Sequence, residues 1–291
     1  MTPTRATPLL LIPFALAACT KADDTGATDA FSELSAALHD TIASLVYVSW
    51  EQLEPATVHV EFSGDGETWL QSPARQLEPG AQEELLLGIP YDSEGQYRLV
   101  VDAGDGPITT GTHTITTGAQ PEGVPTLELL ASNVEAWDPD THWVLGSIDE
   151  LNDLGVSVAT WSFIFGRDGR VVWAWETPEQ RATIHARVAR TGTEFLLDYG
   201  SFWAIFDGGE ASKIARLKID GTEVALYDTP GLHHPFTDTP DGSLLWGAHN
   251  GSWNILRRLD PDGTMEDLWS CSELYDEIGY DDYGCSTNFS T

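Results

Sequence analysis

Two adjacent histidines, His233 and His234, are the residues of this sequence best suited to chemistry. They stand in "GLHHPFTDTPDGSLLWG" (231–247), ahead of an Asp-Gly pair and a short apolar run. A neutral imidazole can act as a nucleophile or exchange protons near neutral pH. The same two rings could instead be polar caps at the end of a strand, bonded to neighbouring loops. Repetition of the stretch elsewhere in the chain would favour the chemical interpretation.

The stretch is one copy of a repeat. His185 in "ATIHARVARTGTEF" and His234 each lie seven or eight residues ahead of a glycine that opens an apolar strand. His185 and Arg187 share one face of an extended strand, because side chains alternate along it. A third copy begins at "CSTNFST" (285–291). We therefore predict that His185, His233 and His234 face one axis, and that Arg187 or Arg257 reaches the same axis if the ligand is anionic.

The repeat predicts an array of antiparallel sheets. Three segments share the form strand, Asp-Gly turn, strand, and their turn residues Asp168, Asp220 and Asp262 are 52 and 42 positions apart. A second kind of unit, a turn followed by an apolar strand, precedes two of them. One unit of each kind makes a four-stranded sheet of roughly 45 residues, the size of a β-propeller blade. The hairpins are 163–177, 214–229 and 255–270, the other units are 189–200 and 239–251, and 137–148 belongs to a first, irregular blade.

The part from 41 to 118 has a different pattern of short alternating strands. These lie at about 45–51, 57–70, 83–89, 96–104 and 112–118, and "SGDGETW" is a hairpin signal because Asp-Gly supplies positive φ. Strands at this spacing favour a β-sandwich. The pattern resembles a fibronectin type III or immunoglobulin-like module, which implies Trp50 as the core tryptophan and Tyr97 as the corner tyrosine. Residues 119–130, rich in Gly and Pro, read as the linker to the array at 131–291.

The N-terminus reads as an export signal. Residues 1–18 hold one early arginine and an apolar run, and Leu16-Ala17-Ala18-Cys19 resembles the lipobox of bacterial lipoproteins. That resemblance implies a lipid on Cys19, a tether over 19–40 and a place in the bacterial cell envelope, facing the periplasm or the cell surface. The alternative is an ordinary signal peptide with a cysteine nearby.

The two remaining cysteines, Cys271 and Cys285, have 13 residues between them. An oxidising compartment permits a disulfide, which for a loop of this size stabilises by about 3 kcal/mol. Metal binding is the weaker alternative, since no neighbouring His or Cys completes a tetrahedral set. No metal or cofactor is expected.

The charge balance excludes one class of partner. With 14 Lys+Arg against 46 Asp+Glu the net charge is −32, and 41% of residues are hydrophobic. An acidic surface of this size repels phosphate backbones, so nucleic acid is not an expected partner. The apolar content is that of a folded protein and not of a disordered acidic chain.

The array, at about 130–291, resembles the bacterial arylsulfotransferase family through its tandem histidines, "PDGSLL" unit and aromatic Asp-Gly hairpins. The resemblance implies a propeller funnel that passes a sulfuryl group between phenols through a histidine, without a cofactor. His233 and His234 occupy the family's tandem position, and Asn288 matches the asparagine of a later His-x-Asn motif. Ser286, two residues before Asn288, replaces that motif's histidine, so little or no transfer is expected.

The repeats make about three blades, roughly half of what that family's propeller needs. The expectation is therefore a truncated product or a propeller that a second chain completes. A protein of another class remains open, namely a cell-surface lipoprotein that binds or adheres without catalysis.

Overall fold

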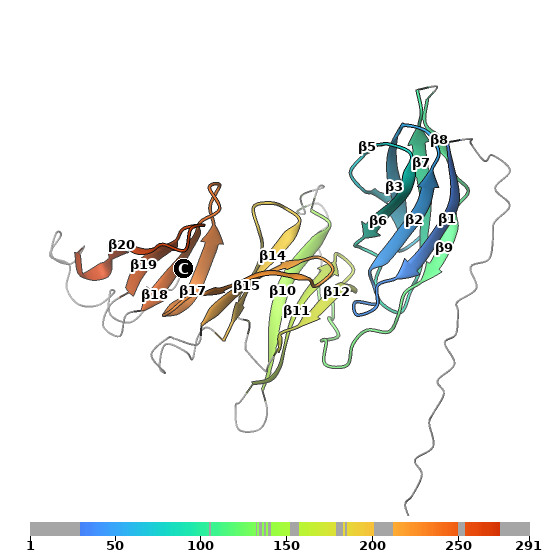
Figure 1. Ribbon diagram of the computed structural model, residues 1–291. Helices are drawn as coiled ribbons and strands as arrows, with labels where there is room; N and C mark the ends of the chain where they lie inside the picture. The colour runs from blue at the N-terminus through green and yellow to red at the C-terminus, as the bar shows by residue number, and fades with distance from the viewer. Residues whose placement is uncertain are drawn as a thin grey trace, which may run out of the picture.

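The computed structural model describes residues 30–104, 106–131, 133, 136, 138, 141–151, 157–178, 183, 185–200, 212–249 and 254–273. For residues 149–151, 157–159, 233 and 234 the backbone alone is described. Within these ranges the chain is all-β, with twenty strands in five antiparallel sheets (Figure 1). Two sheets form the N-terminal part, and three follow one another away from it.

The N-terminal part is a two-layer sandwich. Its two sheets enclose one core, which holds Trp50 at 3% exposure and Tyr97 at 2%. Trp50 donates its indole N–H to the Gln52 side chain at 2.9 Å, and Tyr97 stacks on the His113 ring. The first sheet is β1 (Phe31–Leu38), β2 (Val46–Gln52) and β6 (Gly80–Leu86). The second has β3 (Ala56–Ser63) and β7 (Glu94–Asp102) at its centre, edged by β4 (Leu70–Gln71), β5 (Arg75–Leu77), β8 (Ile108–Thr109) and β9 (His113–Thr116).

The predicted tether over 19–40 is wrong for its last part, because Phe31–Leu38 forms β1. Phe31 is buried, and Leu34, Ala36 and Leu38 pack against the sandwich core. A bulge at Glu33, whose φ is 58°, separates these two apolar sets and breaks the period-two pattern. The sandwich therefore begins about ten residues earlier than the sequence indicates.

The array consists of three sheets, and its hairpins at 163–177, 214–229 and 255–270 are confirmed. The strands in each sheet pair in chain order. The first sheet has three strands among the described residues, where a full blade would have four. Sheet 1 is β10 (Trp143–Leu151), β11 (Ser157–Gly166) and β12 (Val171–Glu176). Sheet 2 is β13 (Ala186–Val188), β14 (Glu194–Tyr199), β15 (Lys213–Lys218) and β16 (Glu223–Asp228). Sheet 3 is β17 (Leu232–Asp238), β18 (Leu244–His249), β19 (Asn254–Leu259) and β20 (Met265–Ser270).

The three hairpin turns share one construction. The carboxylates of Asp168, Asp220 and Asp262 each accept the backbone N–H two residues on, at 3.0, 2.8 and 2.9 Å. The glycine after each aspartate has a φ of 82°, 80° and 88°, a region that side-chain-bearing residues avoid. The bond from Thr264 lowers the pKa of Asp262. The repeated Asp-Gly pair therefore forms the same turn in all three sheets.

The segment predicted as a linker, 119–130, is packed against the array. Val124 is 7% exposed in the same cluster as Trp161, and Leu127 packs against that cluster. At the same junction the Tyr91 amide donates to the Val171 carbonyl at 3.1 Å. These isolated apolar residues among glycines and prolines anchor the segment, so it is no free linker.

Candidate functional site

The first strands of sheets 2 and 3 are joined by side chains that bond to backbone. Arg187 of β13 donates from Nη1 to the carbonyl of Phe236 in β17 at 2.6 Å. Just after β13, the Arg190 amide donates to the Asp238 carboxylate at 3.0 and 3.2 Å. β13, which His185 directly precedes, and β17, which contains His233 and His234, are therefore neighbours. We call His185, Arg187 and the strand β17 the inner-edge site.

His185 lies directly before β13, at the exposed end of this site. Its amide donates to the Asp198 carboxylate at 2.9 Å, and Asp198 is fully buried in β14. Partial desolvation of the ring, together with the nearby Arg187 cation, lowers the pKa of His185 below its ordinary value. Both effects favour the neutral imidazole, which is the form a nucleophile or a hydrogen-bond acceptor needs.

The structure brings some of the predicted residues together and leaves others undescribed. His233 and His234 belong to β17, where the pairing with β18 shifts register between Leu232 and Phe236. Their side chains lie outside the description, so the convergence of the three histidine rings stays a prediction. Asn288, Cys19 and Cys285 also lie outside the described residues. Cys271 is described and is 2% exposed after β20, and its pairing with Cys285 stays a prediction.

Asp238 is a member of the site that the sequence did not reveal. Its side chain is 6% exposed, and it accepts from Arg216 Nη2 at 3.0 Å as well as from the Arg190 amide. Arg216 also lies 3.5 Å from Glu194. In "FTDTPDG" the residue looks like one more turn aspartate. Its position in the sequence could have indicated this role. It lies two residues after Phe236 in one strand and so shares the buried face, where an acid needs a partner.

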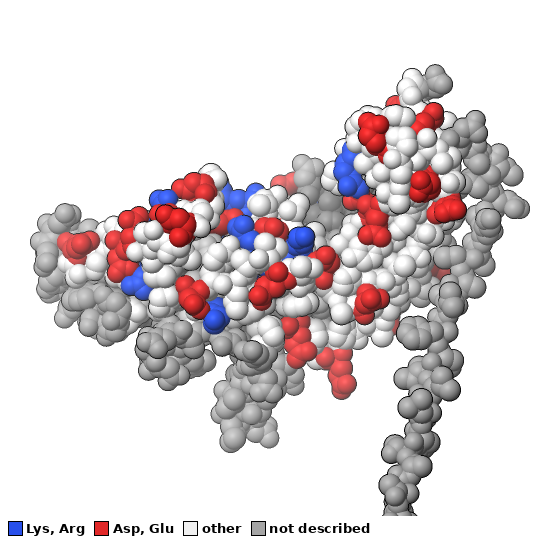
Figure 2. All heavy atoms as spheres, in the orientation of Figure 1, with Lys and Arg blue, Asp and Glu red and all other residues white. Residues whose placement is uncertain are grey.

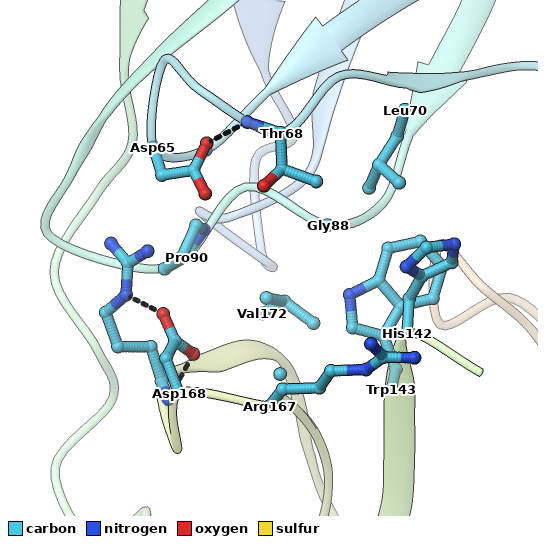
Figure 3. Close-up of a pocket in the computed structure, with 13 residues that line it drawn as sticks. Asp65, Thr68, Leu70, Gly88, Pro90, His142, Trp143, Arg167, Asp168 and Val172 are labelled. Atoms are coloured by element: carbon cyan, nitrogen blue, oxygen red, sulfur yellow. Dashed lines mark hydrogen bonds and ion pairs between the residues drawn. The ribbon is translucent and has the colours of Figure 1, made fainter. Parts of the chain in front are cut away.

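A hollow with a volume of about 280 Å³ lies between the sandwich and sheet 1 (Figure 3). Asp65 faces it from the sandwich, and Trp143, Arg167 and Asp168 face it from the array. Asp65 accepts from the Thr68 amide at 2.7 Å, while Arg167 donates to two backbone carbonyls of the loop before β10. Arg170 pairs with Asp168 at 2.5 Å. Because each of these polar groups already has a partner within its own part of the chain, we assign this hollow to the joint between the two parts.

The surface is acidic over both parts, and basic side chains are seen mainly on the array in the view of Figure 2. Among the described residues, no three His, Cys, Asp or Glu side chains gather closely enough to hold a metal ion. In the same part of the chain, no helix has the length and apolarity to cross a membrane.

Comparison with known proteins gives little guidance. No protein-family model matches the sequence, and no curated protein matches it. A crystal structure of a eukaryotic initiation factor superposes with a TM-score of 0.28 at 11% identity, covering 82% of this chain and 55% of that one. The FN1–FN3 domains of chicken CNTN1 superpose with a TM-score of 0.24 at 11% identity, covering 82% and 66%. This chain thus spans less than two thirds of either structure, and superpositions this loose carry no argument about function.

Proposed function

We propose that this chain is a lipid-anchored protein of the bacterial cell envelope whose inner-edge site binds an aryl sulfate or a phenol. In this proposal sheets 1 to 3 are blades of an arylsulfotransferase-type β-propeller, and the sandwich is a fibronectin type III-like module. The observation that carries it is the Arg187–Phe236 bond, which joins β13, the strand that His185 directly precedes, to β17, which contains His233 and His234.

The chemistry that such a site supports is sulfuryl transfer through nitrogen. An imidazole nitrogen would attack sulfur, forming an N–S bond as the S–O bond to the aryl group breaks. The departing phenolate needs a proton from a second group, and charge on the sulfuryl oxygens needs a cation such as Arg187. In this chain Ser286 stands where the family has a second histidine. The proposal is therefore binding of the aryl ester with little turnover.

The test is a titration of the full chain with 4-nitrophenyl sulfate. Calorimetry measures the binding affinity, and the release of 4-nitrophenol measures turnover. We expect Arg187→Gln to weaken binding at least about fivefold, since a charge-assisted contact contributes roughly 1.5–3 kcal/mol. Arg187→Lys should retain much of the affinity, and Arg170→Gln, in the joint between the parts, should change nothing. Unchanged affinity in Arg187→Gln would show that the inner-edge site does not bind the aryl sulfate. Robust release of 4-nitrophenol that depends on an added phenol as acceptor, and that is lost in His233→Ala or His234→Ala, would instead establish a transferase.

A second candidate is a non-catalytic binding or adhesion lipoprotein. The observation that favours it is the single buried cluster shared by the sandwich and sheet 1, with Ile42, Leu45 and Tyr91 on one side and Trp161 and Phe163 on the other. Such a joint presents the sandwich in a fixed orientation, as a recognition module requires. Absence of any aryl sulfate binding, in folded protein, would favour this candidate.

The anchor has its own test. Expression in a bacterial host with labelled palmitate should label the protein, and Cys19→Ala should abolish the label while leaving the inner-edge site unaffected. The reason is that acylation needs the thiol of that one residue. An unlabelled mature product that is released from the membrane would overturn the anchor without touching the ligand proposal.

A further inference from the structure

Sheets 2 and 3 can be compared at matched positions, because their strands pair in the same order and their Asp-Gly turns lie 42 residues apart. Ile214 pairs with Tyr227 in sheet 2, and Leu256 pairs with Trp269 in sheet 3, each 42 residues further on. In sheet 2 the face that bears Ile214 is turned toward sheet 3, and Ile214 is 0% exposed. Leu196 on the same face is 1% exposed. The part of the outer face of sheet 2 that bears Ile214 and Leu196 is therefore covered.

The equivalent face of sheet 3 is open. Leu245, Leu256 and Trp269 form the floor of an apolar cleft of about 280 Å³, with Arg187 at one end. Leu256 is 37% exposed, although its counterpart Ile214 is completely buried. A single exposed leucine is common in folded proteins. An apolar cleft at a position whose counterpart in the preceding sheet is buried indicates that another segment covers it.

The repeat shows which kind of residue covers this face. Phe236 of β17 is 2% exposed and packs in one cluster with Ile214 and Leu196, against the outer face of sheet 2. It stands in "HHPFTD" (233–238), and the third copy of that segment reads "STNFST" (286–291). Phe289 therefore holds the place in the third copy that Phe236 holds in the second.

We propose that residues 286–291 dock on the outer face of sheet 3 and that Phe289 fills the cleft over Leu256 and Trp269. The chain can reach it, because the twelve residues from 274 to 285 span up to about 40 Å when extended. The distance across three strand spacings of sheet 3 is only about 14 Å. The inference rests on the repeat and does not depend on the aryl sulfate proposal.

The experiment measures the reactivity of single introduced cysteines in the full chain. Leu256→Cys and Leu226→Cys are matched probes, since these side chains are 37% and 43% exposed among the described residues. Maleimide labelling, quantified by mass spectrometry at the substituted position, should be at least about tenfold slower at position 256 than at 226. Adding Phe289→Ala should restore the rate at 256 and leave 226 unchanged, whereas Phe289→Leu should retain most of the protection.

Two results would overturn this inference. Equal rates at 256 and 226 would show that nothing covers the cleft. Protection at 256 that grows with protein concentration, with a doubled mass in sedimentation, would identify a second copy as the cover. Unchanged circular dichroism in each variant confirms that labelling reports on the folded chain.

Discussion

Gly221→Ala is expected to lower the free energy of unfolding by about 3 kcal/mol. Gly221 has a φ of 80°, and an added Cβ would lie 2.3 Å from Cζ3 of Trp175, across the junction between sheets 1 and 2. A left-handed conformation costs an L-residue roughly 1–2 kcal/mol, and overpacking adds roughly 1–3 kcal/mol. Urea denaturation followed by tryptophan fluorescence measures the change.

The repeat offers a matched control at Gly263. This residue occupies the same turn in sheet 3 with a φ of 88°, and an added Cβ there would meet nothing within 4 Å. Gly263→Ala should therefore incur only the backbone cost, about 1–2 kcal/mol. Equal losses in the two variants would contradict the view that close approach of Trp175 makes Gly221 necessary.

The parts of the fold predicted correctly are those encoded over short distances. An Asp-Gly pair fixes a turn through its own side chain and its positive φ, so the hairpins around Asp168, Asp220 and Asp262 could be located from the sequence. β1 was missed because the bulge at Glu33 breaks its alternation. The packing of residues 119–130 could not be predicted, because Val124 becomes an anchor only when sheet 1 is present to receive it.

The site was predictable to the extent that it repeats. Similar spacing to a following glycine brought out His185 and His234, and Arg187 bonds the strand after His185 to the strand that contains His234. Asp238 differs from the turn aspartates in its contacts with Arg216 and the Arg190 amide. These contacts arise only where segments of sheets 2 and 3 meet. A pairing between sheets leaves no periodic mark in a single sequence.

Asp238→Ala is expected to destabilise the array by about 3–4 kcal/mol, more than most surface changes. The carboxylate is 6% exposed and accepts from Arg216 and the Arg190 amide, so its removal leaves a largely buried guanidinium and an unpaired N–H. Losing one partner of a buried pair typically costs roughly 3–5 kcal/mol. Asp238→Asn keeps an acceptor of the same size and should lose less, about 1–2 kcal/mol.

The double variant Asp238→Ala with Arg216→Met separates the charge from the packing. If the stranded Arg216 cation causes the loss, adding Arg216→Met should recover part of it, because methionine leaves no buried charge. Glu194, 3.5 Å from Arg216, is too distant to replace Asp238 fully, and its side chain is 17% exposed. Denaturation of the single and double variants in parallel gives the coupling energy, which should be about 1–2 kcal/mol. Strictly additive losses would mean that Asp238 acts through the Arg190 amide alone, and that its ion pair with Arg216 contributes nothing to the junction between sheets 2 and 3.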